Sequence, residues 1–177
     1  MDESPAHREL IRILRNAYSG ELAAAYAYRG HWKSVKDSDE RSKIHQIERD
    51  EWLHRERVGG MLVDLDSGPR KTKEVKMWVI GRTTGLLCHV TGWFFPMYFA
   101  GRLECGNVAE YEDAASRAGE LGLAELVADL QTMAMVEQEH EIFFSSMVAG
   151  HRLLPLMRAV FNWGPADMNE ARSKKAA

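Results

Sequence analysis

Long stretches of the chain place apolar residues at alternating spacings of three and four, the pattern of an amphipathic helix that faces a bundle core. Turn-forming segments such as Asp66-Ser67-Gly68-Pro69 separate these stretches. Strict alternation of apolar and polar residues, typical of a half-buried strand, does not occur. The chain is therefore predicted to be all-α, with helices over about residues 5–36, 39–65, 77–118, 123–149 and 153–163.

The third predicted helix opens with an apolar run from about Met77 to Leu103. Its central part, TTGLLCHVTGWFFPMYFAG, has roughly the length that a membrane span needs. It also contains a histidine, two internal glycines and Pro96, and the sequence has no second comparable run, so a buried or membrane-touching helix is predicted instead. The clustered aromatic residues, among them Trp93, Phe95 and Phe99, indicate contact with a membrane surface or an apolar ligand.

Acids and histidines interrupt the apolar seams of the four long helices near their middles. Apart from tyrosines, the other central seam positions are apolar or small. A buried carboxylate without a partner costs several kcal/mol or stays protonated, so acids that converge in one core layer need a positive partner. The interrupting residues are Glu21, Glu51, His54, Glu104, Glu137 and His140.

This set has the di-iron carboxylate pattern, in which two helices contribute one glutamate each and two others contribute Glu-x-x-His. The spacing of three puts Glu51 and His54 on one helix face, and Glu137 and His140 on another. Both halves of the chain repeat the order, with a seam glutamate about 30 residues before Glu-x-x-His. Two divalent cations would neutralise the four carboxylates, and oxygen and imidazole ligands favour iron or manganese over zinc.

Several alternatives remain open. Glu-x-x-His is a short motif that occurs by chance, so both pairs could be solvated, salt-bridging faces. A single metal ion, or zinc, would use part of the same set. Glu110 or Glu112 could replace Glu104, although both lie off the seam. Asp50 could reach a histidine ligand on the facing helix, and Tyr111, two turns after Glu104, could hydrogen-bond near the site.

Composition and charge narrow the function classes. The 177 residues are 45% hydrophobic and 28% charged, which predicts one folded domain over residues 1–177, with a polar tail over 165–177. A net charge of −3 argues against nucleic-acid binding. The two cysteines, Cys88 and Cys105, are too few for a disulfide framework, which favours a reducing compartment. The acidic, polar start MDESPAHREL does not resemble a signal peptide, so a cytoplasmic protein is predicted. His31 and Glu48 are interpreted as an end-of-bundle histidine and a solvated acid outside the site.

Four segments resemble the demethoxyubiquinone hydroxylase family, which are ferritin-like di-iron monooxygenases of ubiquinone biosynthesis. The segments are GELAAAYAYRGH, IERDEWLHRERVGGML, GRLECGNVAEY and VEQEHEIFF, and they contain all six candidate ligands. The family has a ligand glutamate followed seven residues later by tyrosine, as Glu104 is followed by Tyr111, which favours Glu104 over Glu110. The chain departs from the family in having Glu110 where a histidine is frequent, and in a shorter link before the last long helix.

The resemblance implies a ferritin-like four-helix bundle with additional short apolar helices and two iron ions bound by the six residues. It implies hydroxylation of a polyprenyl quinone intermediate with O₂, with NADH as the ultimate reductant. Trp93, Phe95 and Phe99 would contact the quinone or the membrane, and the protein would lie peripherally on the inner face of the cell membrane, with a homodimer possible in solution. The alternatives are a ferritin-like di-iron oxidase, peroxidase or iron-binding protein with a soluble substrate, or a helical scaffold with a structural metal.

Overall fold

Six helices make up most of residues 4–165, the part of the chain that the computed structural model describes. They are α1 (Pro5–Ser34), α2 (Ser38–Asp64), α3 (Lys71–Leu87), α4 (Phe94–Glu120), α5 (Ala124–Val148) and α6 (Leu154–Phe161). No strand occurs within these residues, so the all-α prediction is confirmed. The predicted polar tail lies outside the described residues, apart from its first residue.

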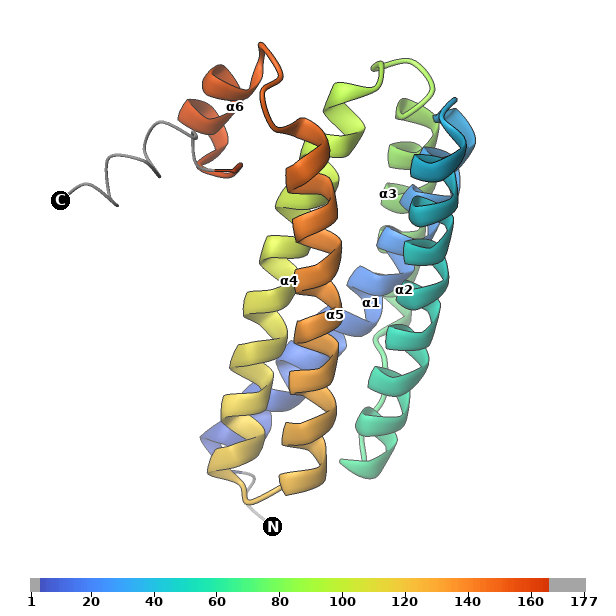
Figure 1. Cartoon of the computed structure of the whole chain (residues 1–177). Coiled ribbons are helices and arrows are strands. Elements are labelled where there is room, and N and C mark those ends of the chain that lie inside the picture. The colour runs from blue at the N-terminus through green and yellow to red at the C-terminus, as the bar shows by residue number, and fades with distance from the viewer. Residues whose placement is uncertain (1–3, 166–177) are drawn as a thin grey trace, which may run out of the picture.

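The bundle consists of α1, α2, α4 and α5 (Figure 1). α1 and α5 run in one direction, and α2 and α4 run in the other. α3 packs along α1 and carries the chain from the end of α2 back to the start of α4. One long crossover between two antiparallel helix pairs is the connectivity of ferritin-like bundles.

The starts of the first two helices follow from their sequence. Ser4 accepts a hydrogen bond from the backbone N–H of His7 at 3.2 Å, and Pro5 occupies the opening turn of α1. Asp37 accepts hydrogen bonds from the backbone N–H groups of Asp39 and Glu40 at 2.9 and 3.0 Å, which caps α2. These contacts satisfy amide groups that have no partner inside the helix.

The apolar core is divided into two clusters along the bundle axis. Leu10, Leu14 and Leu130 belong to the cluster near the start of α1, and Ile47 and Phe144 belong to the cluster near its end. The six acids and histidines of the seams belong to neither cluster, because they fall between the two along every long helix. A polar layer therefore lies between two apolar ones.

The prediction of one continuous third helix over 77–118 is wrong. α3 ends at Leu87 and α4 begins at Phe94, and residues 88–93 turn the chain. Gly92 in this turn has a φ of 79°, a left-handed conformation that glycine adopts without a steric penalty. Pro96 lies in the first turn of α4, where a missing N–H needs no partner. Val90, which a continuous helix would place on the seam, is 77% exposed.

The closest contacts between α3 and α1 are made by glycines. The fully buried residues of α3 are Gly81 and Gly85. A Cβ atom on Gly81 would collide with the backbone of Ala23, and one on Gly85 would lie 2.8 Å from the carbonyl oxygen of Tyr26. The two backbones therefore touch, and apolar side chains of α3 such as Leu86, which is 70% exposed, face outward. None of the helices within residues 4–165 combines the length and apolar composition that a membrane span requires.

Two glycine-to-alanine substitutions test this contact. A glycine inside a helix costs about 0.5–1 kcal/mol relative to alanine, so propensity alone predicts that both substitutions stabilise the protein. Gly20→Ala in α1 meets no atom within 4 Å, and we expect it to raise the free energy of unfolding. Gly81→Ala forces α3 away from α1, and we expect a loss of about 1–3 kcal/mol in chemical denaturation. Equal stabilisation by both substitutions would contradict the close backbone contact.

Candidate metal centre

The six seam residues meet in one layer at the middle of the bundle. Each is at most 5% exposed, although all six are polar or charged. α1 and α4 each contribute a single glutamate, whereas α2 and α5 each contribute a glutamate and a histidine one turn apart. The residues are Glu21 on α1, Glu51 and His54 on α2, Glu104 on α4, and Glu137 and His140 on α5.

Their ligand atoms form two overlapping groups. The first group is Glu21, Glu51, His54 and Glu137, and the second is Glu51, Glu104, Glu137 and His140. Within each group, one ligand atom of every residue lies within 4.8 Å of those of the others. Glu51 and Glu137 belong to both groups, and each group also contains one histidine and one further glutamate, so the two groups together could hold two cations.

Unpaired polar atoms in this layer provide a test of whether cations fit. Within residues 4–165, both carboxylate oxygens of Glu51, one each of Glu21 and Glu137, and Nδ1 of His140 are buried without a hydrogen-bond partner. Buried polar atoms in folded proteins nearly always have a partner. Carboxylate oxygens and imidazole nitrogens are the ligands that iron accepts. The buried cluster therefore fits two iron ions.

The pKa shifts of the four glutamates also favour a cluster that binds cations. Burial raises the pKa of Glu51 and of Glu104 well above the ordinary value, and repulsion from Glu137 raises both further. Burial also raises the pKa of Glu21. Burial acts on Glu137 in the same direction, but the neighbouring imidazoles of His140 and His54 outweigh it and hold the pKa of Glu137 low. Of the four carboxyls, Glu137 is the one whose pKa lies below its ordinary value.

Asp50 and Tyr111 lie next to the cluster. Nε2 of His140 is 3.3 Å from the Oδ2 atom of Asp50 across the space between α5 and α2. Its Nδ1 atom faces the cluster, 3.4 Å from Oε2 of Glu137 and 3.7 Å from Oε1 of Glu51. The Tyr111 hydroxyl donates a hydrogen bond to Glu21. A carboxylate on the outer nitrogen of a histidine sets the tautomer that leaves the inner nitrogen free for a metal.

Comparisons with known proteins agree with this architecture. A comparison with protein-family models finds no match, and a comparison with curated proteins finds none. A solved structure described as a ferritin-like, diiron-carboxylate protein from Bacillus anthracis str. Ames superposes with a TM-score of 0.62 at 17% identity, over 82% of this chain and 99% of that one. The fold is ferritin-like. This confirms the predicted four-helix bundle with additional helices.

Tyr28 is a buried residue of α1 that was not among the site residues predicted from the sequence. In the structure, its hydroxyl donates a hydrogen bond to Oε1 of Glu104. The other oxygen of Glu104 accepts one from Nδ2 of Asn107 at 3.0 Å. The internal repeat could have indicated this role, because Tyr28 follows Glu21 by the same seven residues that separate Tyr111 from Glu104. Each tyrosine hydrogen-bonds the glutamate of the other half.

The remaining acidic candidates lie outside both ligand groups. Glu110 is half-buried, and burial raises its pKa to about 7, but no described group of ligand atoms includes it. Glu112 is exposed. The interpretation of Glu48 as a solvated acid is wrong, since it is 5% exposed and accepts hydrogen bonds from Arg29 and from Trp32 Nε1, both at 2.7 Å. These two donors come from α1, so Glu48 joins α1 to α2.

An apolar cavity of about 430 Å³ borders the cluster between α1, α3 and α4. Tyr28 is part of its wall, and the same side chain hydrogen-bonds Glu104. Phe95 and Phe99 line it as well, and they are 37% and 42% exposed. The cavity therefore extends from a residue that contacts the candidate ligand Glu104 to the molecular surface. Trp93 is also exposed, but its Nε1 atom donates to Glu40 at 2.7 Å and it does not line the cavity.

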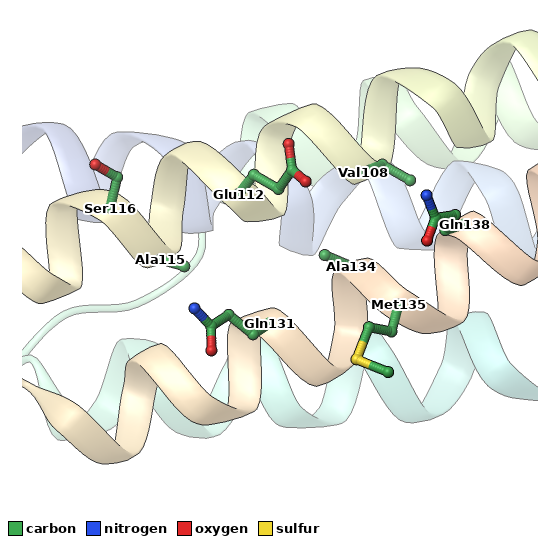
Figure 2. A pocket seen from close by; sticks show the side chains of 8 residues that line it. All are labelled: Val108, Glu112, Ala115, Ser116, Gln131, Ala134, Met135 and Gln138. Carbon is green, nitrogen blue, oxygen red and sulfur yellow. The ribbon is translucent and has the colours of Figure 1, made fainter.

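A second hollow lies on the outer side of α4 and α5. Figure 2 shows polar side chains around it, including Glu112, Gln131 and Gln138. Its volume is about 480 Å³, and none of the six candidate ligands lines it. Tyr28 and Tyr111, which hydrogen-bond residues of the cluster, do not line it either, whereas Tyr28 lines the apolar cavity.

Substitution of a shared glutamate tests the cluster. Glu51 belongs to both ligand groups, so we expect Glu51→Ala to weaken iron binding by more than about tenfold, since even outer partners of metal ligands contribute that much. Glu110→Ala is the control, and we expect unchanged iron binding. The measurement is iron content after anaerobic loading at equal Fe(II) concentration. Loss of iron from Glu110→Ala together with retention by Glu104→Ala would show that the ligand set is wrong.

The raised pKa values predict how metal-free protein responds to pH. Glutamates whose pKa is raised by folding stabilise the protein below their ordinary value of 4.5 and lose this contribution as pH rises through the raised values. The lowered pKa of Glu137 changes the stability of the protein only below pH 4.5. The lowered pKa of His31 changes the stability of the protein only below pH 6.5. Calorimetry of chelator-treated protein should therefore show the melting temperature falling as pH rises above 6.5. A rise over this range would contradict a cluster of protonated glutamates.

Proposed function

We propose that the chain is a di-iron monooxygenase that hydroxylates the ring of a membrane-embedded polyprenyl quinone intermediate of the demethoxyubiquinol type. The observation that carries this proposal is the apolar cavity, which joins exposed Phe95 and Phe99 to Tyr28 beside Glu104. A metal centre that is reached through an uncharged, apolar cavity suits an apolar substrate. The resemblance of the four ligand-bearing segments supports the same choice, and with it NADH as the ultimate electron source.

Each residue of the cluster has a role in this proposal. The six candidate ligands hold two iron ions, which when bound supply the activation of O₂. Asp50 fixes the His140 ring so that Nδ1 faces the ions. Tyr28 and Tyr111 hold the carboxylates of Glu104 and Glu21 by hydrogen bonds. The apolar clusters above and below the layer exclude water from it.

The shape of the cavity suits a ring with an apolar substituent. Its volume of about 430 Å³ is in the range of small-molecule sites. A ring placed beside Tyr28 would direct its tail between Phe95 and Phe99 toward the surface. Burial of that tail gains about 25 cal/mol for each Å² removed from water. A soluble, strongly polar substrate would gain nothing from these walls.

The surface around the cavity mouth supports contact with a membrane. Leu103 beside Phe99 is 43% exposed, Leu87 at the end of α3 is 50% exposed, and Val90 in the following turn is 77% exposed. Large exposed apolar patches mark contacts with membranes or proteins. We propose that this face lies on the inner surface of the cell membrane, from which the substrate enters, and that a second copy of the chain covers it in solution.

Membrane contact has a matched pair of tests. Phe95→Ser combined with Phe99→Ser removes the aromatic surface at the cavity mouth, and we expect weaker binding to phospholipid vesicles with unchanged iron content. Met135→Ser combined with Ile142→Ser removes two apolar side chains that are more exposed, 66% and 62%, from α5. We expect vesicle binding of this second variant to match the wild type. Equal losses in both variants would show that the cavity mouth is not the contact.

The activity itself is tested with isotopically labelled O₂. Iron-loaded protein, a chemical reductant and a short-chain demethoxyubiquinol should yield a product that carries one labelled oxygen atom, detected by mass spectrometry. Glu51→Ala should yield none. Consumption of O₂ with iron oxidation but without labelled product would favour a ferritin-like oxidase or iron-binding protein that acts on a soluble substrate.

A further inference from the structure

His31 is a polar side chain in the wall of the apolar cavity. It lies one helical turn after Tyr28 on α1 and is 3% exposed. Its ring stacks against Phe144 and Tyr28, with centroid distances of 6.0 and 6.3 Å. The Nε2 atom is buried and has no hydrogen-bond partner among the residues that the structure describes. The interpretation of His31 as an ordinary end-of-bundle histidine leaves this unpaired nitrogen unexplained.

The cavity is uncharged along its whole wall. Burial lowers the pKa of His31 to about 4, so its imidazole is neutral near pH 7. A neutral imidazole has one nitrogen that donates and one that accepts a hydrogen bond. No aspartate, glutamate, lysine or arginine lines the cavity. A charged ligand would therefore lose its hydration without gaining a partner, whereas an uncharged hydroxyl or carbonyl group would gain one.

The polar groups of the cavity are distributed unevenly. Tyr28 and His31 are buried, whereas Thr84, Thr91, Phe95 and Phe99 are exposed at the outer side. The Tyr28 hydroxyl already donates its proton to Glu104. Of the buried polar side chains in the wall, His31 is the one with an unpaired nitrogen. The ring that carries this nitrogen lines the cavity.

We infer that His31 is the polar anchor of the cavity, which hydrogen-bonds an oxygen substituent of an uncharged ring and holds that ring beside Tyr28. This inference rests on the proposed use of the cavity as the substrate site. It adds the orientation of the ligand, with its oxygen-bearing ring inside and its apolar tail toward Phe95 and Phe99. It also adds the basis of selection, since His31 favours uncharged oxygenated rings over hydrocarbons and over carboxylates.

Three probes with the same tail separate these contributions. They are para-hexylphenol, hexylbenzene and para-hexylbenzoate, each added to displace the neutral fluorophore phenylnaphthylamine from iron-loaded protein under nitrogen. We expect the wild type to bind the phenol about tenfold more tightly than hexylbenzene, as one neutral hydrogen bond allows, and the benzoate more weakly than the phenol. His31→Leu should bind phenol and hexylbenzene equally, with unchanged affinity for hexylbenzene. His31→Gln keeps a donor and an acceptor, and it should retain most of the preference.

Two results would overturn the inference. One is equal binding of phenol and hexylbenzene by the wild type, and the other is a preference for phenol that survives in His31→Leu. Iron content and melting temperature check that the variants fold, and His31→Phe, which keeps a ring against Phe144, is the second apolar variant should His31→Leu not fold. Because the assay involves no turnover, phenol selectivity without quinol hydroxylation would contradict the proposed function and leave the His31 inference intact. Hydroxylation of the quinol without selectivity for the phenol would support the proposed function and contradict the His31 inference.

Discussion

Four glutamates buried in a single layer of an apolar bundle cannot all ionise without a positive partner, and the rest of the structure is arranged around that layer. α2 packs closely on α1, and α5 on α4, whereas α2 and α5 approach each other at few places. His54 and Glu137, 2.8 Å apart, form one of the contacts that cross between these halves. Cations held by Glu51 and Glu137 would join the halves where direct packing is weakest.

The two halves of the bundle are related through their tyrosines. Tyr28 of the first half hydrogen-bonds Glu104 of the second, and Tyr111 of the second hydrogen-bonds Glu21 of the first. The repeat of a glutamate followed by tyrosine and then Glu-x-x-His therefore describes a crossed set of contacts about the cluster. Outside the cluster the two halves differ, since α3 covers α1 and creates the apolar cavity on the side of Glu104.

The sequence predicted the cluster well because a bundle core is periodic. An acid on the seam, such as Glu51, is recognisable from its spacing alone, and its partners lie on seams that must face it. The turn over residues 88–93 was missed because it lies within an apolar run, where a helix and a buried turn share the same composition. The cavity could not be predicted, since it depends on the glycine contact that fixes α3 against α1. The significance of His31 and the burial of Glu48 likewise depend on neighbours distant in sequence.

An anaerobic equilibrium titration of metal-free protein with Fe(II), with bound iron and released protons measured together, tests the central claim most directly. The buried cluster predicts saturation at two iron ions per chain, accompanied by proton release, because the pKa values of Glu51 and Glu104 are raised without cations and bound cations would lower them. Saturation at one ion or fewer, or binding without proton release, would contradict a buried dinuclear centre.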